Sequence, residues 1–99
     1  MATIGTFTAG KDGYTGMIRT LTVNVKAQIK ANDAKKNDGA PDFRVYAGRA
    51  ELGAAWIKRT SGDEPQEYLS VRLDDPSFAE PIHAALFERD GAAILVWNR

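Results

Sequence analysis

Apolar and polar residues alternate along one stretch of the chain, from Met17 to Ala31, and the alternation is strict from Thr20 to Lys30. Within it the odd positions are apolar (Leu21, Val23, Val25, Ala27 and Ile29) and the even positions are polar (Thr20, Thr22, Asn24, Lys26, Gln28 and Lys30). Because successive side chains of a β-strand point to opposite faces, this pattern predicts one long antiparallel strand with a buried and a solvated face. The pattern therefore indicates a domain that is all-β or nearly so.

Shorter segments of the same kind predict the remaining strands. They are Thr3–Thr8, Phe43–Ala47, Trp56–Thr60, Tyr68–Leu73, Ile82–Phe87 and Ala92–Trp97. Gly48–Gly53 is ambiguous, since it fits either a helical turn or a continuation of the sheet. These segments amount to six or seven strands with short connections.

Turn-forming residues separate the strands. Gly10–Gly16 has three glycines at the spacing of a phosphate loop, but a strand rather than a helix follows them, so a hairpin is favoured. The polar stretch Asn32–Pro41 predicts an exposed loop, and Asp90-Gly91 between apolar runs is a strong hairpin signal. Asp75–Phe78 fits a single helical turn, with Asp75 at its N-cap and Pro76 after it.

The simplest closure of these strands is an antiparallel meander curled into a small barrel or sandwich, because a single open sheet would leave an apolar face in water. We thus predict an all-β domain with at most one short helical turn. Its expected core residues are Leu21, Val23, Val25, Phe43, Val45, Leu69, Val71, Leu73 and Leu86.

Length and composition narrow the class of protein. A chain of 99 residues makes one domain, residues 1–99, and its apolar and charged fractions of 43% and 26% are ordinary for a soluble globular protein. Thirteen basic and thirteen acidic residues cancel, which disfavours non-specific nucleic-acid binding without excluding a local patch. The absence of cysteine, of a secretion signal and of a long apolar run predicts a soluble protein of the cytoplasm.

Residues that commonly carry catalysis are scarce. His83 is the single histidine and alternates against Ile82 and Ala84, so we expect it at the surface and outside any catalytic site. Asp74 and Asp75 are adjacent, which suits a turn better than a paired acid and base. The sequence therefore predicts a protein that is not an enzyme and that holds neither a metal nor a cofactor.

A better candidate for function is one face of the predicted sheet. The outward positions of three consecutive strands carry aromatic and cationic residues, namely Arg44, Tyr46, Trp56, Lys58, Tyr68 and Arg72. If these strands are neighbours, the face suits either a protein partner, through Trp, Tyr and Arg hot spots, or single-stranded nucleic acid, through base stacking. The alternative is structural: Trp56 in the core, tyrosines covering sheet edges and cations that are simply solvated.

A second basic feature follows the long strand and its loop, and it consists of Lys26, Lys30, Lys35 and Lys36. Lysines on the solvated face of a strand commonly serve solubility and discourage strand-to-strand aggregation. We assign this feature no binding role.

Several segments resemble a bacterial family called domain of unknown function 736. They are Ile4–Phe7, Gly13–Gly16, Phe43–Tyr46, Glu51–Trp56, Tyr68–Phe78 and Leu95–Arg99, of which Leu-Asp-Asp-Pro-Ser-Phe is the most specific. The resemblance covers essentially the whole chain. It implies a small stand-alone protein of plasmids and integrative conjugative elements, and it brings no catalytic residue and no assigned activity.

The mobile-element setting that the resemblance implies, together with the neutral net charge, favours a protein partner over single-stranded nucleic acid. Accessory proteins of such elements often bind host or transfer machinery, including as inhibitors of defence systems such as CRISPR nucleases. Others bind the transferred single strand, for which a positive net charge would be more suitable. We therefore expect a non-enzymatic accessory protein that binds a protein partner, with single-stranded nucleic-acid binding in conjugative transfer as the alternative.

Overall fold

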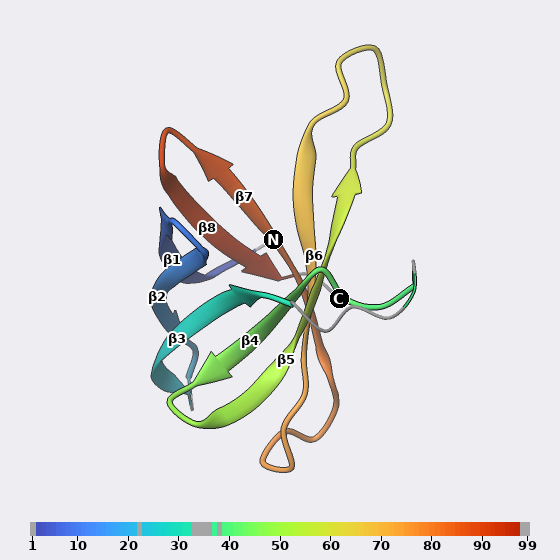
Figure 1. Ribbon diagram of the computed structural model, residues 1–99. Coiled ribbons are helices and arrows are strands. Elements are labelled where there is room, and N and C mark those ends of the chain that lie inside the picture. The colour runs from blue at the N-terminus through green and yellow to red at the C-terminus, as the bar shows by residue number, and fades with distance from the viewer. Residues whose placement is uncertain (1, 22, 33–36, 38, 98–99) are drawn as a thin grey trace.

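The computed structural model describes residues 2–21, 23–32, 37 and 39–97. Its eight strands are β1 (Ala2–Gly10), β2 (Gly13–Arg19), β3 (Asn24–Ala31), β4 (Phe43–Ala47), β5 (Ala50–Arg59), β6 (Glu67–Leu73), β7 (Ile82–Arg89) and β8 (Ala92–Trp97). Each strand pairs antiparallel with the next along the chain, and β8 returns to pair with β1, so the sheet is a closed barrel (Figure 1). The described residues contain no helix. The prediction of an all-β antiparallel barrel is confirmed.

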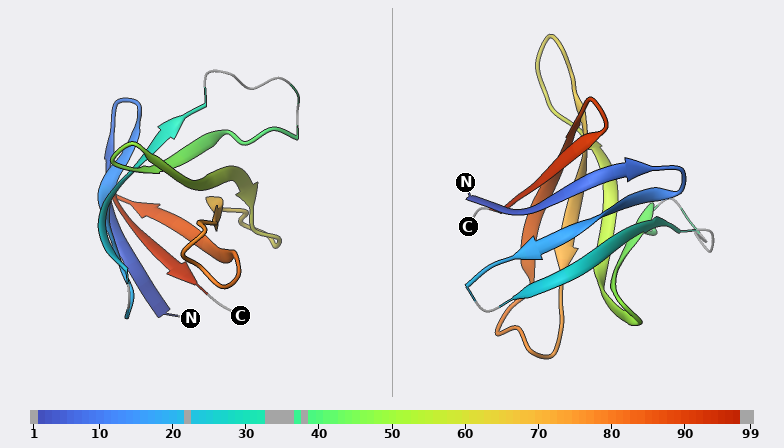
Figure 2. Two further views of the ribbon diagram at one scale, coloured as in Figure 1. Left: turned by 90° about the horizontal axis from the view of Figure 1, so that it is seen from below. Right: turned by 90° about the vertical axis from the view of Figure 1, so that its left-hand side faces the viewer.

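Closure rests on the pairing of the first and last strands. Thr8 lies opposite Ala92 at one end of this ladder and Ala2 lies opposite Trp97 at the other, with an irregularity between Thr3 and Gly5. Figure 2 shows β1 and β8 side by side. Because this ladder is made, each of the eight described strands has a neighbour on both sides, which protects its edges from pairing with another chain.

The inward positions of all eight strands fill the barrel with apolar side chains. An eight-stranded barrel has an interior just wide enough for such filling. The buried residues are Ile4, Phe7, Ile18, Ala27, Ile29, Val45, Leu52, Ala55, Leu69, Val71, Leu73, Leu86, Ala93 and Leu95. Five of the nine expected core residues are among them, and Val23, Val25 and Phe43 are partly buried against this core.

Leu21 is the one expected core residue that lies outside, with its surface 100% exposed. The single long strand predicted over Met17–Ala31 is wrong, because the chain reverses between Thr20 and Val23. The Thr20 amide donates to the Val23 carbonyl oxygen at 2.7 Å, and the Val23 amide donates to Thr20 Oγ1 at 3.0 Å. The buried residue of β2 is Ile18, at an even position, and it pairs with Val25, at an odd position. Inward side chains therefore change from even to odd positions across this turn. The turn contains no Gly, Pro or Asn, so the sequence gives no turn signal there.

The division of the long strand into two brings the strand count from the expected six or seven to eight. The ambiguous Gly48–Gly53 segment continues the sheet and lengthens the strand predicted at Trp56–Thr60, as the start of the ten-residue β5. Asp75–Phe78 forms a hydrogen-bonded turn without a helix, in which Phe78 N–H donates to the Asp75 carbonyl oxygen. The Ser77 side chain and amide both donate to the Asp75 carboxylate, and these bonds lower the pKa of Asp75.

Glycine allows the strands to approach closely where the barrel coils. A Cβ built on Gly16 would lie 2.0 Å from the Thr6 carbonyl oxygen, and one on Gly53 would lie 1.9 Å from that of Arg72. Neither distance is possible for a real side chain. The Asp90-Gly91 hairpin, by contrast, uses positive φ angles of 55° and 85°, as expected for a two-residue turn of this sequence.

The exposed and buried leucines make a matched test of this fold. Leu95→Ala should lower the free energy of unfolding by about 2–5 kcal/mol, because it empties space in the centre of the barrel. Leu21→Ala should change that free energy by no more than about 0.5 kcal/mol. Urea unfolding followed by circular dichroism measures both. Equal losses in the two variants would contradict the turn at Thr20–Val23.

Candidate functional site

The candidate site is the outer wall formed by β4, β5 and β6. These strands are neighbours in the barrel, as the sequence argument requires. Arg44 pairs with Ala54, which pairs with Arg72, and Lys58 pairs with Tyr68. Their chain neighbours Val45, Ala55 and Leu69 are buried inside the barrel, so the paired side chains point outward. All six predicted residues are at least partly exposed on this wall: Arg44, Tyr46, Trp56, Lys58, Tyr68 and Arg72.

The six residues do not form one cluster. Tyr46 pairs with Glu51 near the start of β5, whereas Lys58 lies seven residues further along the same strand. At about 3.3 Å per residue, these two ends of the wall are roughly 23 Å apart. Trp56, Arg44 and Arg72 occupy the middle.

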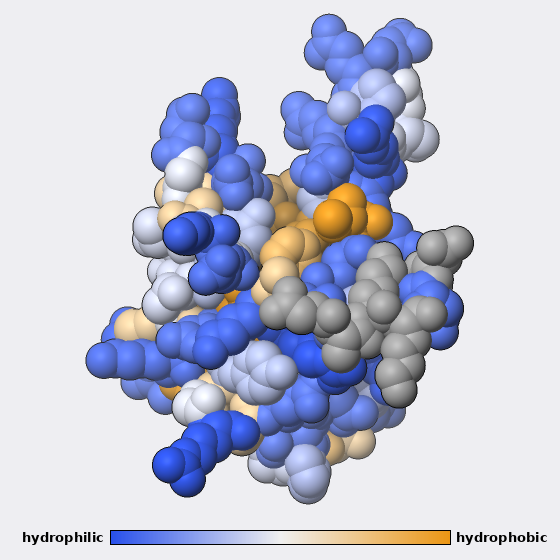
Figure 3. All heavy atoms as spheres, in the orientation of Figure 1, coloured by the Kyte–Doolittle hydropathy of each residue, from blue (hydrophilic) through white to orange (hydrophobic). Residues whose placement is uncertain are grey.

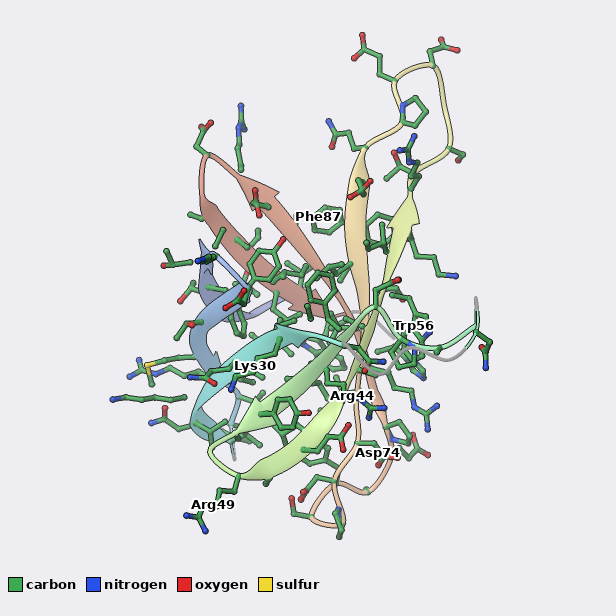
Figure 4. The ribbon with its side chains drawn as sticks, viewed as in Figure 1. Lys30, Arg44, Arg49, Trp56, Asp74 and Phe87 are labelled. Atoms are coloured by element: carbon green, nitrogen blue, oxygen red, sulfur yellow. The ribbon has the colours of Figure 1, made fainter. Side chains whose placement is uncertain are left out.

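A surface hollow of about 280 Å³ lies in this middle part, and we call it the Trp56 hollow. Its lining consists of Glu51, Gly53, Ala54, Trp56, Arg72 and Asp74. Gly53 and Ala54 make the floor because they have little or no side chain, while the larger residues stand around them. Figure 4 shows Trp56, Arg44 and Asp74 along the same side of the barrel, with Lys30 and Arg49 further away.

Trp56 is held in place by the segment before β4. Its indole N–H donates to the Gly39 carbonyl oxygen at 3.1 Å. The Asp42 carboxylate accepts the amide hydrogen of Ile57, the next residue of β5, at 2.9 Å. Asn32 Nδ2 donates to the Pro41 carbonyl oxygen at 2.8 Å, which ties the other end of the same connection. The indole is therefore held in place beside the hollow, and Trp56 is partly exposed and not a core residue.

The two arginines of the wall each have a carboxylate beside them. Arg44 donates to Glu51 at 2.5 Å and to Asn32 Oδ1 at 3.3 Å, and the Arg72 guanidinium lies 3.7 Å from the Asp74 carboxylate. These side chains are 38–53% exposed, so the pairs contribute little to stability. Their effect is to make the rim of the Trp56 hollow neutral. Sequence reasoning assigned no site role to Glu51 or Asp74, because cross-strand pairing decides their position.

Tyr46 and Tyr68 lie on either side of the hollow and have other partners. The Lys30 ammonium lies 5.9 Å from the centre of the Tyr46 ring, a cation–π contact from β3. The Tyr68 ring stacks on Phe87 of β7, with ring centres 5.4 Å apart and planes 23° apart. Phe87 was not among the predicted site residues, although its apolar outward position in an alternating strand is a signal that sequence reasoning can use.

Tyr68 and Phe87 begin an apolar strip on the outer wall of β6, β7 and β8. Phe87 pairs with Ile94, which is 45% exposed, and Ala85 pairs with Val96 one row away. Outward positions of a solvated sheet are normally polar, so an apolar strip of this kind marks a contact surface. We call these residues the outer strip: Tyr68, Ala85, Phe87, Ile94 and Val96.

His83 is exposed on the outer wall, where it pairs with Arg72, in agreement with the surface position expected for it. In the described part of the chain, no three His, Cys, Asp or Glu side chains gather as a metal site would require. The described residues also form no helix that is long and apolar enough to cross a bilayer. Of the predicted basic feature, Lys26 and Lys30 are exposed on β3, and Lys35 and Lys36 lie outside the described residues.

A second group of polar residues lines one open end of the barrel. Here the β5–β6 and β7–β8 hairpins project apart, and apolar surface is visible between them (Figure 3). A cavity of about 240 Å³ lies at this opening, lined by Tyr14, Glu67, Tyr68, Leu69, Leu86 and Glu88. Burial raises the pKa of Tyr14 to about 12, and the hydrogen bond to Glu88 and the negative charges of Glu88 and Glu67 add to the shift. The phenol of Tyr14 therefore stays neutral at physiological pH.

One family model matches this chain. It is described as Protein of unknown function (DUF736) and matches residues 3–99, so the chain belongs to that family and the resemblance seen in the sequence is confirmed. No curated protein and no solved structure matches the chain. The family description assigns no activity, so function has to be argued from the surface.

The raised pKa of Tyr14 leads us to expect a loss of stability at high pH. The folded-state pKa of about 12 lies above the ordinary 10.0, so Tyr14 contributes stability that is complete below pH 10 and is lost as the pH rises towards 12. Glu88→Gln should lower the Tyr14 pKa, because it removes a negative charge beside the phenol. The measurement is phenolate absorbance against pH, with Tyr14→Phe identifying the transition that belongs to Tyr14. A Tyr14 transition at the same pH in Glu88→Gln would contradict the assignment.

Proposed function

We propose that this member of the DUF736 family is a non-enzymatic accessory protein that binds a protein partner in the cytoplasm through the outer wall of β4–β6. The contact centres on Trp56 and extends through Tyr68 onto the outer strip. The observation that carries the proposal is the combination of partly exposed aromatic side chains with arginines whose charges are already neutralised by Glu51 and Asp74.

This combination has the composition of a protein–protein hot spot. Trp, Tyr and Arg are the residues enriched at such positions, and they act most strongly where the surrounding surface excludes water. Trp56 is held rigid by its bond to Gly39 and Tyr68 by its stack on Phe87, so little side-chain freedom is lost on binding. The adjoining outer strip supplies apolar area.

Single-stranded nucleic acid is the alternative partner. One feature favours it. Lys58 lies beside Tyr68, and no carboxylate of the described residues is within ion-pair distance of Lys58. A free lysine beside an aromatic ring can contact a phosphate while a base stacks on the ring. Against it, Glu51 and Asp74 stand in the middle of the wall, where they repel phosphates and occupy both arginines. The neutral net charge of the chain points the same way.

The family resemblance narrows the class of protein partner that we propose. A protein of a mobile element meets the transfer machinery and the defence systems of its host, and an inhibitor of a defence nuclease acts by binding rather than by catalysis. A protein without a recognisable catalytic set suits this role. Plasmid interference by a CRISPR system, measured with and without this protein, tests the defence role directly.

Capture from host cells tests the binding face. The double variant Trp56→Ala, Tyr68→Ala should lose at least one partner that the wild type recovers, because it removes both aromatic anchors. The matched control is Thr15→Ala, Gln28→Ala, a paired and exposed set on the outer wall of β2 and β3. Quantitative mass spectrometry compares the three proteins after circular dichroism has shown that each is folded.

Fluorescence anisotropy with a labelled single-stranded oligonucleotide separates the two partner classes. We expect no micromolar binding at physiological salt. Micromolar binding that weakens steeply with salt, with a log–log slope of about −0.7 per neutralised phosphate, and that the double variant abolishes, would overturn the proposal in favour of nucleic acid.

A further inference from the structure

The Trp56 hollow has the shape of a pocket for a single side chain. Its volume of about 280 Å³ lies over two consecutive small residues of β5, Gly53 and Ala54, of which Ala54 is the outward one, set among larger neighbours. Gly53 is small for a structural reason, since any Cβ there would collide with the backbone of β6. Ala54 has no such reason, because it points outward between Arg44 and Arg72 and a larger side chain would simply extend over the wall.

The charges around the hollow indicate a neutral occupant. Three charged side chains line it, namely Glu51, Arg72 and Asp74, and Arg44 pairs with Glu51 beside them. A carboxylate entering the hollow would be repelled by Glu51 and Asp74, and an ammonium or guanidinium would be repelled by Arg72. Each charged group therefore meets a like charge as well as an opposite one. An uncharged group disturbs neither pair.

The walls of the hollow favour a flat ring. The indole of Trp56 forms one side and is fixed by its hydrogen bond to Gly39, while the Arg72 guanidinium stands on the neighbouring strand. Aromatic rings stack on indole, and planar guanidinium groups stack on aromatic faces. A ring lying on Ala54 therefore has a favourable surface on two sides.

We propose that the Trp56 hollow receives one neutral aromatic side chain, Phe or Tyr, from the partner protein. This inference rests on the proposed protein-binding function and adds the chemistry of the contact. The aromatic residue is the anchor of the partner, and the paired charges around the hollow form the rim that excludes water from it.

Side-chain fragments test the proposal on the protein alone. The probes are p-cresol, methylguanidinium and propionate, with uridine monophosphate as a nucleotide probe, each titrated into isotope-labelled protein. The readout is the two-dimensional NMR shift of the Trp56 indole N–H and of the Ala54 and Arg72 amides. We expect saturable shifts at these positions with p-cresol and weaker binding of the other three.

Filling the hollow supplies the matched variants. Ala54→Val and Ala54→Leu should weaken p-cresol binding in that order, by roughly tenfold for the leucine. Ala92→Leu is the control, because Ala92 is an exposed outward alanine on β8 that lies away from the hollow. Valine and leucine are both accepted at outward strand positions. If the leucine variant does not fold, the valine variant still tests the proposal.

Asp74→Asn tests the argument from paired charges. This change frees Arg72, so propionate should bind the variant at least as well as p-cresol does, and better than it binds the wild type. The inference is overturned if p-cresol gives no saturable shift, if a charged probe or the nucleotide binds the wild type more tightly, or if Ala54→Leu leaves p-cresol binding unchanged. The proposed function is tested separately by the capture experiment, in which Trp56 and Tyr68 are replaced by alanine.

Discussion

The pairing of β1 with β8 is the interaction on which the rest of the structure depends. It joins the two ends of a meander that would otherwise be an open, strongly twisted sheet with an apolar face in water. Once the ladder is made, every strand has an inside and an outside. Among the described residues, the inside is then filled by the fourteen buried apolar residues of the core and by partly buried ones packed against them. Any binding function has to lie on the outer wall or at an open end.

Close strand packing in the barrel and the surface hollow lie next to each other on β5. The barrel requires a residue without a side chain at Gly53, because β5 approaches the β6 backbone too closely for a Cβ. The next residue, Ala54, points outward, and its small side chain leaves the hollow open on the outer wall. The packing constraint explains Gly53, whereas Ala54 is the residue that leaves room for an occupant.

The net charge of zero does not show how charged residues are distributed over the barrel. Outward strand positions carry arginines and lysines, whereas Glu67 and Glu88 gather at an open end near Tyr14. On the candidate wall, Glu51 and Asp74 neutralise the arginines locally. The exposed tryptophan thus lies where carboxylates stand beside arginines.

The sequence by itself determined most of the local structure. Alternation placed Val45 and the apolar residues of Tyr68–Leu73 correctly inside, and put the six candidate residues outside, because the two faces of a strand follow from a period of two. Asp90-Gly91 specified its own hairpin through the φ angles that it permits. The turn at Thr20–Val23 escaped detection, and with it the exposure of Leu21, since its residues also suit a strand and only the pairing of Ile18 with Val25 selects the reversal.

The tertiary structure alone decided which residues meet across strands. Arg44 reaches Glu51 because the register shifts between Val45 and Tyr46, and Tyr68 meets Phe87 because β6 and β7 are neighbours in the closed barrel. Neither contact has a signature in the spacing of residues along the chain, since register is set by the packing of the whole sheet. For this reason the sequence determined which side chains are outside, and the fold decided which of them form a site.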